Sequence, residues 1–116
     1  MRATVTARQF TFIVDEPEAD GGQDSGPMPT EYLLGSLASC FALALAYSAR
    51  KREIELPAFS VRAEGTYDGP SFGSLRLVVE MDDPPDTIDS LMERARRVCY
   101  VSNTLARHAP LEVTRA

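Results

Sequence analysis

The 116-residue sequence has no tryptophan, one histidine and only two cysteines. A single histidine, His108, cannot form a metal site alone, and no CxxC or HExxH spacing occurs, so we expect no metal and no cofactor. Cationic residues are also scarce, with 12 Lys and Arg against 17 Asp and Glu, a net charge of −5. This balance argues against nucleic acid as a partner, because phosphate binding needs clustered cations.

The basic residues are scattered, apart from two groups, Arg50-Lys51-Arg52 and Arg94, Arg96 and Arg97. Both groups lie toward the ends of predicted helices. Cations there interact favourably with the helix dipole. The sequence alone therefore favours a structural role for both groups.

Long apolar runs are absent as well. The run from Tyr32 to Tyr47 has 16 residues without charge and contains Gly35, Ser36 and Ser39. It is shorter than the ~18 to 20 residues typical of a membrane span. The N-terminus, MRATVTARQF, has no apolar region typical of a signal peptide. We therefore expect a buried core helix in a cytoplasmic protein without a membrane partner. In that compartment a permanent structural disulfide is not expected.

A chain of this length predicts a single domain, residues 1–116. Its pattern predicts β structure, as one strand or a tight hairpin, over 3–14, and an acidic Gly- and Pro-rich loop over 15–29. A helix then starts at Pro29, capped by Thr30 or by a residue just before Pro29, and runs to about Arg52.

The second half of the chain predicts a hairpin, a helix and a short strand. Alternating apolar residues indicate strands over 59–68 and 75–81, with DGPSFG as the turn. A second helix starts at Thr87 with Asp86 as its cap, and Leu111 and Val113 suggest a last strand. Antiparallel hairpins with grouped helices are typical of the α+β class.

Cys40 and Cys99 allow two interpretations. Free cysteines are often simply small buried core residues. However, Cys40 lies in the middle of the long apolar helix, and Cys99 lies on the inward stripe of the second helix. If both helices pack over one sheet, the two thiols meet. Such a pair supports peroxide reduction, in which one thiolate becomes a sulfenic acid and the second thiol condenses with it.

Two segments resemble known motifs. GPMPTEYLLGSLASCFALAL is similar to the first-cysteine motif of the OsmC/Ohr family, the osmotically inducible and organic hydroperoxide resistance proteins, and RRVCYVSNTL is similar to its second-cysteine motif. The resemblance extends from about residue 10 to 116. It implies an α+β fold in which a long central apolar helix and a second helix pack on antiparallel sheet, built as an intertwined homodimer.

The resemblance also implies an activity. Cys40 matches the attacking position and Cys99 the resolving position of a Cys-based peroxidase that reduces organic hydroperoxides in oxidative-stress defence. The resulting disulfide would be reduced by a dithiol, such as a lipoyl protein. An apolar pocket would favour organic hydroperoxides, because it buries their alkyl part.

The sequence departs from the best-characterised branch of the family at three places, and is closer to the OsmC-like branch. Thr30 stands where that branch has a glutamate, and Glu31 lies nine residues before Cys40. On a regular helix this places Glu31 about 180° from Cys40. Tyr100 replaces the proline that commonly follows the second cysteine, so the helix can continue past Cys99. The N-terminal region that carries the activating arginine is short.

We take Glu31 and Arg8 as the candidate activating pair. Glu31 can instead complement the helix dipole, and Arg8 can be an exposed strand residue. Two other functions stay open for the whole chain. One is a dimer of the same fold that binds a small apolar or thiol ligand without peroxidase activity. The other is a redox sensor, which has less support because no DNA-reading element occurs.

Overall fold

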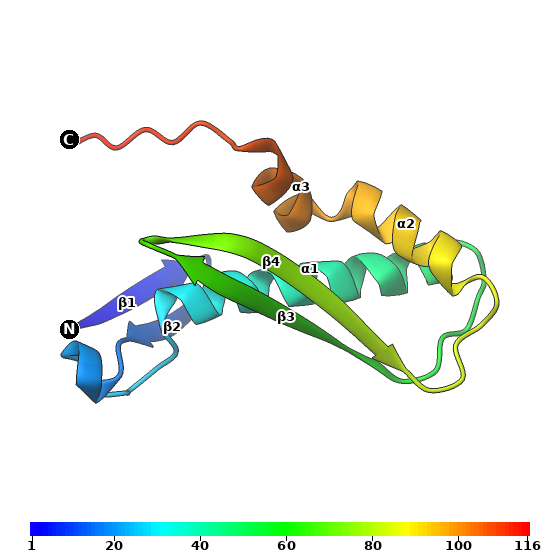
Figure 1. Ribbon diagram of the computed structural model, residues 1–116, viewed down its shortest axis with the longest axis horizontal. Helices are drawn as coiled ribbons and strands as arrows, with labels where there is room; N and C mark the ends of the chain where they lie inside the picture. Colours follow the sequence, from blue (N-terminus) through cyan, green and yellow to red (C-terminus); the bar gives the residue numbers. More distant parts are fainter. The chain divides into compact units, whose positions relative to one another are not determined.

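The computed structural model describes residues 1–116, which form two compact units, Met1–Gly35 and Ser36–Ala116. The fold is α+β, as predicted, with two antiparallel hairpins (Figure 1). The elements in chain order are β1 (Arg2–Ala7), β2 (Phe10–Asp15), a short 3-10 helix η1 (Glu18–Asp20), α1 (Pro29–Arg50), β3 (Phe59–Asp68), β4 (Ser71–Met81), α2 (Ile88–Val98) and α3 (Tyr100–Arg107).

The N-terminal unit begins with a tight hairpin, one of the two alternatives that the sequence left open. β1 and β2 pair antiparallel, and the last pair is Ala7 with Phe10. Arg8 and Gln9 therefore form a two-residue turn. Arg8 has φ 54°, the left-handed conformation that tight hairpin turns require.

The acidic loop after β2 is organised around one buried carboxylate. Asp15 is 2 % exposed and accepts backbone N–H groups from Glu16 (2.8 Å), Gln23 (3.2 Å) and Ser25 (3.1 Å), together with the Ser25 hydroxyl (2.5 Å). The loop folds back so closely that a Cβ at Gly22 would lie 1.8 Å from the Glu16 carbonyl oxygen. The 15-residue segment is thus a hydrogen-bonded structure built on Asp15.

These hydrogen bonds, the Ser25 hydroxyl first among them, hold the pKa of Asp15 well below its ordinary value. Its contribution to stability is therefore complete above the unfolded pKa of about 3.9 and is lost as the pH falls through the lower folded value.

We expect Asp15→Asn to accelerate amide hydrogen exchange at Gln23 and Ser25 at pH 7. The exposed Asp24→Asn is the matched control. Equal protection in both variants would contradict this role for Asp15.

Helix α1 starts at Pro29, as predicted, and ends at Arg50 rather than Arg52. The Glu31 carboxylate accepts the backbone N–H of Met28 (2.8 Å), so it satisfies a donor at the helix start. By length and composition alone, α1 could cross a membrane, although 33 % of its most apolar stretch is buried within the chain. The prediction of a buried core helix therefore holds for one face of α1, whereas most of its apolar stretch is not buried within the chain.

The core of the C-terminal unit lies where α1 meets α2 and the β3–β4 hairpin. Leu45 and Leu91 are fully buried at its centre, and Ala44, Ala49 and Ala95 let the helix backbones approach closely. Figure 1 shows the hairpin running beside these helices. Its inner face packs against them through Phe59, Val61, Leu77, Val79 and Met81.

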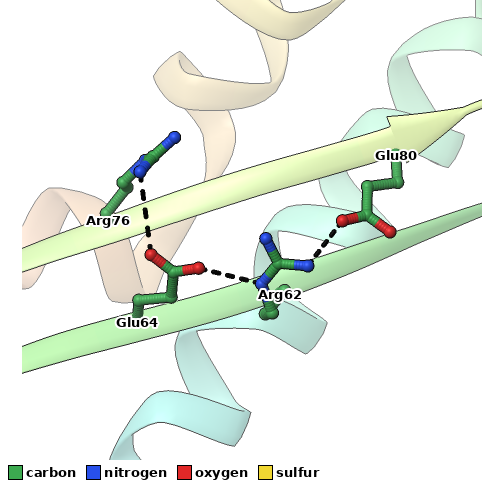
Figure 2. Close-up of polar contacts among 4 residues, drawn as sticks. All are labelled: Arg62, Glu64, Arg76 and Glu80. Carbon is green, nitrogen blue, oxygen red and sulfur yellow. Dashed lines mark hydrogen bonds and ion pairs between the residues drawn. The ribbon is translucent and has the colours of Figure 1, made fainter.

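The outer face of the hairpin carries a chain of ion pairs. Arg62 contacts Glu64 on its own strand (2.9 Å) and Glu80 on β4 (2.5 Å), and Arg76 approaches Glu64 at 3.8 Å (Figure 2). Glu64 and then Glu80 raise the pKa of Arg62. All four side chains are about half-exposed or more, so the pairs fix the solvent face and contribute little stability.

Three sequence predictions for this unit were wrong. β4 starts at Ser71 rather than residue 75, because Gly69, at φ 59°, forms a tight turn with Pro70. α2 starts at Ile88, and Thr87 takes the cap position that we assigned to Asp86. Residues 108–116 form no strand, because an apolar pair without a neighbouring strand cannot form a ladder. Leu111 and Val113 are 89 % and 87 % exposed.

The second helix does not continue past Cys99, contrary to the prediction from Tyr100. Cys99 is extended, at φ −80° and ψ 104°, and α3 starts after it. The Asn103 side-chain amide donates to the Arg97 carbonyl (3.1 Å), and the Ser102 hydroxyl donates to the Cys99 carbonyl (3.2 Å). The bond from Asn103 satisfies the Arg97 carbonyl, which a continuous helix would have paired, and so supports the break without proline.

Candidate active site

Cys99 occupies the break between α2 and α3. Its side chain is fully buried, with 0 % exposure, among core residues of both long helices. As the N-terminal cap of α3, it places its sulfur at the positive end of that helix. The backbone N–H groups of Val101 and Ser102, in the first turn of α3, are among the groups that favour the thiolate of Cys99. The kink thus gives a buried thiol an environment that favours negative charge.

Cys40 lies opposite, on α1, and is partly exposed. Its side chain packs against the buried cluster that contains Cys99 and is one of the polar groups that affect the Cys99 thiol. Both thiols are free. The structure therefore brings together the two cysteines that lie 59 residues apart (99 − 40 = 59) in the sequence.

The surroundings of Cys99 change the pKa of its thiol. Burial opposes ionisation of Cys99, but the polar groups around its sulfur, those of Ser102 first and then those of Cys40 and Val101, together lower the pKa of Cys99. The buried thiol is thus the one that the surroundings make acidic.

Cys40 opens on a groove between α1 and the α2–α3 break. The groove has a volume of about 610 Å³ and is lined by Cys40, Leu43, Ala44, Tyr47, Arg97, Val98, Tyr100 and Asn103. Leu43 is 72 % exposed and Tyr100 84 % exposed, which is unusual for large apolar side chains. A molecule with an apolar part can therefore reach Cys40 from this side, whereas Cys99 is closed to it.

A second cavity of about 540 Å³ lies between α1, β4, α2 and α3. Phe41, Leu37 and Met92 give it an apolar lining, and Arg96 and Ser102 are polar groups at its wall. Ser102 links this cavity to the hydrogen bonds of Cys99. The thiol pair is thus bordered by one space next to Cys40 and another next to Ser102.

Arg97 is a cation that sequence reasoning missed. It lines the groove together with Cys40, whereas the sequence analysis assigned its group a helix-dipole role. The available signal was its position two residues before Cys99, on the last turn of the helix that ends there. A guanidinium in the groove can stabilise a bound anion or other negative charge next to it.

The other two predicted site residues belong to the N-terminal unit. Glu31 accepts the Met28 N–H, and the Arg8 guanidinium lies 5.1 Å above the centre of the Phe10 ring. Glu31 thus lies at the helix start, where its structural alternative placed it, whereas Arg8 lies in the β1–β2 turn and not in a strand. Their role as an activating pair for Cys40 stays a prediction. No group of three or more His, Cys, Asp or Glu side chains is placed to hold a metal ion.

Comparison with known proteins gives a family and a fold. Residues 22–114 match the family model described as OsmC-like protein. A search of curated protein sequences finds no match.

Three solved structures show the same fold. An OsmC-like protein from Mycoplasma pneumoniae has a TM-score of 0.77 at 19 % identity, over 90 % of this chain and 78 % of its own. An organic hydroperoxide resistance protein from Elizabethkingia anophelis has a TM-score of 0.60 at 24 % identity, over 91 % and 87 %. The organic hydroperoxide resistance protein OsmC from Legionella pneumophila has a TM-score of 0.62 at 18 % identity, over 92 % and 88 %.

Proposed function

The chain belongs to the OsmC-like protein family, and on that premise we propose that it is a thiol-dependent peroxidase that reduces organic hydroperoxides in oxidative-stress defence. The observation that carries the proposal is the packing of Cys40 against the buried cluster that contains Cys99, in which only Cys40 reaches the groove. Structural neighbours named as hydroperoxide resistance proteins support a stress-related redox function.

The first step uses Cys40 as the nucleophile. Its proton passes to the neighbouring Cys99 thiolate. The Cys40 sulfur then attacks the outer peroxide oxygen, the O–O bond breaks, and Cys40 becomes a sulfenic acid while the peroxide is reduced to an alkoxide. The alkoxide takes up the proton held by Cys99 and leaves as the alcohol, so Cys99 is again a thiolate.

The second step uses Cys99 as the resolving thiolate. It attacks the Cys40 sulfur, an S–S bond forms, and hydroxide leaves and is protonated to water. The acidity of Cys99 suits both steps, because it makes this thiol first a proton acceptor and then a nucleophile. A dithiol reductant, for example a lipoyl group on a protein, then restores both thiols in the cytoplasm.

The groove favours organic hydroperoxides over hydrogen peroxide as substrates. Leu43, Val98 and Tyr100 give it apolar surface that would be covered by an alkyl or aryl group. Burial of apolar surface contributes roughly 25 cal/mol per Å², which hydrogen peroxide cannot gain. Glu31 and Arg8 stay the activating pair that the family resemblance implies, and Arg97 is the cation already in the groove.

The hairpins support a homodimer as the working form. β3 and β4 have 10 and 11 residues and pair only with each other, so one edge of each strand has no strand partner. Two-stranded sheets are marginal by themselves. A second copy of the chain that covers these edges, and part of the exposed apolar surface, would complete the fold.

Thiol counting tests the proposal directly. Reduced protein is mixed with one equivalent of cumene hydroperoxide, and free thiols are titrated after the reaction. We expect the loss of both thiols per chain and the formation of one equivalent of cumyl alcohol. If both thiols persist, the chain is not a two-cysteine peroxidase.

A second candidate function is a binding protein of the same fold. It is favoured by the full burial of Cys99 and by captopril, which is bound in one of the active sites of a candidate organic hydroperoxide resistance protein from Vibrio cholerae. Alkylation rates of Cys40 against pH separate the two functions. An apparent pKa at or above the free-thiol value of about 8.5 favours binding without catalysis.

A further inference from the structure

Four cations converge on a cavity beside the thiol groove. The cavity has a volume of about 280 Å³ and is lined by Tyr47, Ser48, Lys51, Arg52, Arg94, Arg97 and Val98. Lys51 and Arg52 follow α1 directly, and Arg94 and Arg97 lie on the last two turns of α2. We call this space, with its four cations, the cationic cavity.

No acidic residue lines the cationic cavity. The ion pairs of the chain join Arg62, Glu64, Glu80 and Arg76 on the hairpin, and none involves these four cations. The helix dipole accounts for a cation at each helix end, but it does not account for two helices directing four cations to one cavity. Their mutual repulsion is relieved by an anion, and arginine binds a carboxylate through two parallel hydrogen bonds.

The cationic cavity continues into the groove that contains Cys40, because Tyr47, Arg97 and Val98 line both spaces. Tyr47 lies at the junction, with the Lys51 ammonium 5.6 Å from its ring centre. The intervening groove surface is largely apolar. The arrangement matches an elongated molecule with an anionic end and a hydrocarbon body.

The length of that molecule follows from the helix. The Lys51 N–H still bonds to the Tyr47 carbonyl, so the helical rise of about 1.5 Å per residue applies up to this point. The cavity therefore lies about 10 Å (Tyr47) to 16 Å (Lys51) along α1 from Cys40. With C–C bonds of about 1.5 Å, an extended chain advances roughly 1.3 Å per carbon, so about 8 to 13 carbons span this distance.

We propose that the cationic cavity is a carboxylate subsite that sets the reach of the substrate: it binds the carboxylate of an acyl chain and places a hydroperoxide about 8 to 13 carbons away at Cys40. The selectivity rests on the proposed peroxidase function, but the carboxylate subsite does not. The cavity would discriminate by charge and by the position of the peroxide along the chain.

Binding of a chain without a peroxide tests the subsite independently of catalysis. The probe is dodecanoate, with methyl dodecanoate and dodecanol as uncharged comparisons, titrated calorimetrically into the full chain. We expect dodecanoate to bind at least tenfold more tightly than either and to slow alkylation of Cys40, since charge-assisted hydrogen bonds are lost in the ester and the alcohol. Equal affinity for the three compounds would overturn the subsite even if the chain is a peroxidase.

A matched pair of double variants locates the binding. Lys51→Gln/Arg94→Gln neutralises two cations of the cavity, and Arg107→Gln/Arg115→Gln removes two exposed charges elsewhere. We expect about tenfold weaker dodecanoate binding only in the first pair. Equal weakening in both pairs would show general charge attraction and reject the proposal. A change of oligomeric state with unchanged affinity in the first pair would identify the cavity as a subunit contact and reject it as well.

Peroxidase assays then test the proposed distance between the carboxylate and the peroxide of the substrate. The substrates are acyl hydroperoxides that carry the peroxide 9 or 13 carbons from the carboxylate. We expect their kcat/KM with the wild-type chain to fall about tenfold when the carboxylate is esterified. We expect a similar fall when the free acids are assayed with Lys51→Gln/Arg94→Gln. Cumene hydroperoxide should be turned over at the same rate by this variant and by the wild type. An equal loss for cumene hydroperoxide would contradict a carboxylate subsite.

Discussion

Replacing Cys40 with serine is expected to lower turnover of cumene hydroperoxide by on the order of 10³-fold or more, because a catalytic nucleophile without its thiol leaves only binding effects. Cys40 is the thiol that lines the groove, whereas Cys99 is fully buried. A serine hydroxyl keeps the size but is far less ionised and less nucleophilic. Steady-state turnover with a dithiol reductant measures the effect.

Ala46→Ser is the matched control for this variant. It places a hydroxyl on the same helix at an exposed position, away from the thiol pair. Its turnover should equal that of the wild type, and both variants should keep the wild-type circular dichroism spectrum. Substantial activity in Cys40→Ser would mean that Cys99 or another group reduces the peroxide.

Replacing Cys99 with serine is expected to slow the first step as well as to abolish resolution. In the proposed reaction the Cys99 thiolate accepts the Cys40 proton before attack. Loss of a positioned proton acceptor typically costs 10²- to 10⁴-fold, so we expect at least about 10²-fold slower oxidation of Cys40 in a single turnover. Rapid mixing of reduced protein with one equivalent of hydroperoxide gives this rate.

Two further observations separate proton transfer from resolution. With excess peroxide, Cys40 in Cys99→Ser should proceed to sulfinic acid, because no thiol captures the sulfenic acid. Ser102→Ala removes a hydrogen bond that lowers the pKa of Cys99, so the pH at which the first step reaches half its maximal rate should rise. A wild-type first-step rate in Cys99→Ser would restrict Cys99 to resolution alone.

The elements with the strongest periodicity were the most predictable from the sequence. The start of α1 at Pro29 and the full extent of β3 follow from proline chemistry and from strict alternation. The break at Cys99 was not predictable from Tyr100. It is supported by the side chain of Asn103, which bonds back to the Arg97 carbonyl of the preceding helix, and by that of Ser102, which bonds to the Cys99 carbonyl. Such side-chain contacts leave the hydrophobic pattern unchanged, so the pattern cannot predict them.

The candidate site was partly predictable for a similar reason. Helical spacing placed Cys40 and Cys99 on facing stripes, and the structure brings these two side chains into contact. The acidity of Cys99 could not be foreseen, because it arises from the start of α3, a helix that the sequence pattern did not separate from α2. The position of Arg97 in the groove was also missed, since a cation at a helix end already had a sufficient local explanation.

The most direct test of the central claim is to map the cysteines after a single turnover. Reduced wild-type protein reacts with one equivalent of cumene hydroperoxide, free thiols are blocked, and peptides are analysed by mass spectrometry without reduction. The account predicts a Cys40–Cys99 disulfide as the dominant product within one chain. Cys40 and Cys99 both recovered as blocked thiols, or Cys40 as sulfinic acid beside a blocked Cys99, would contradict it.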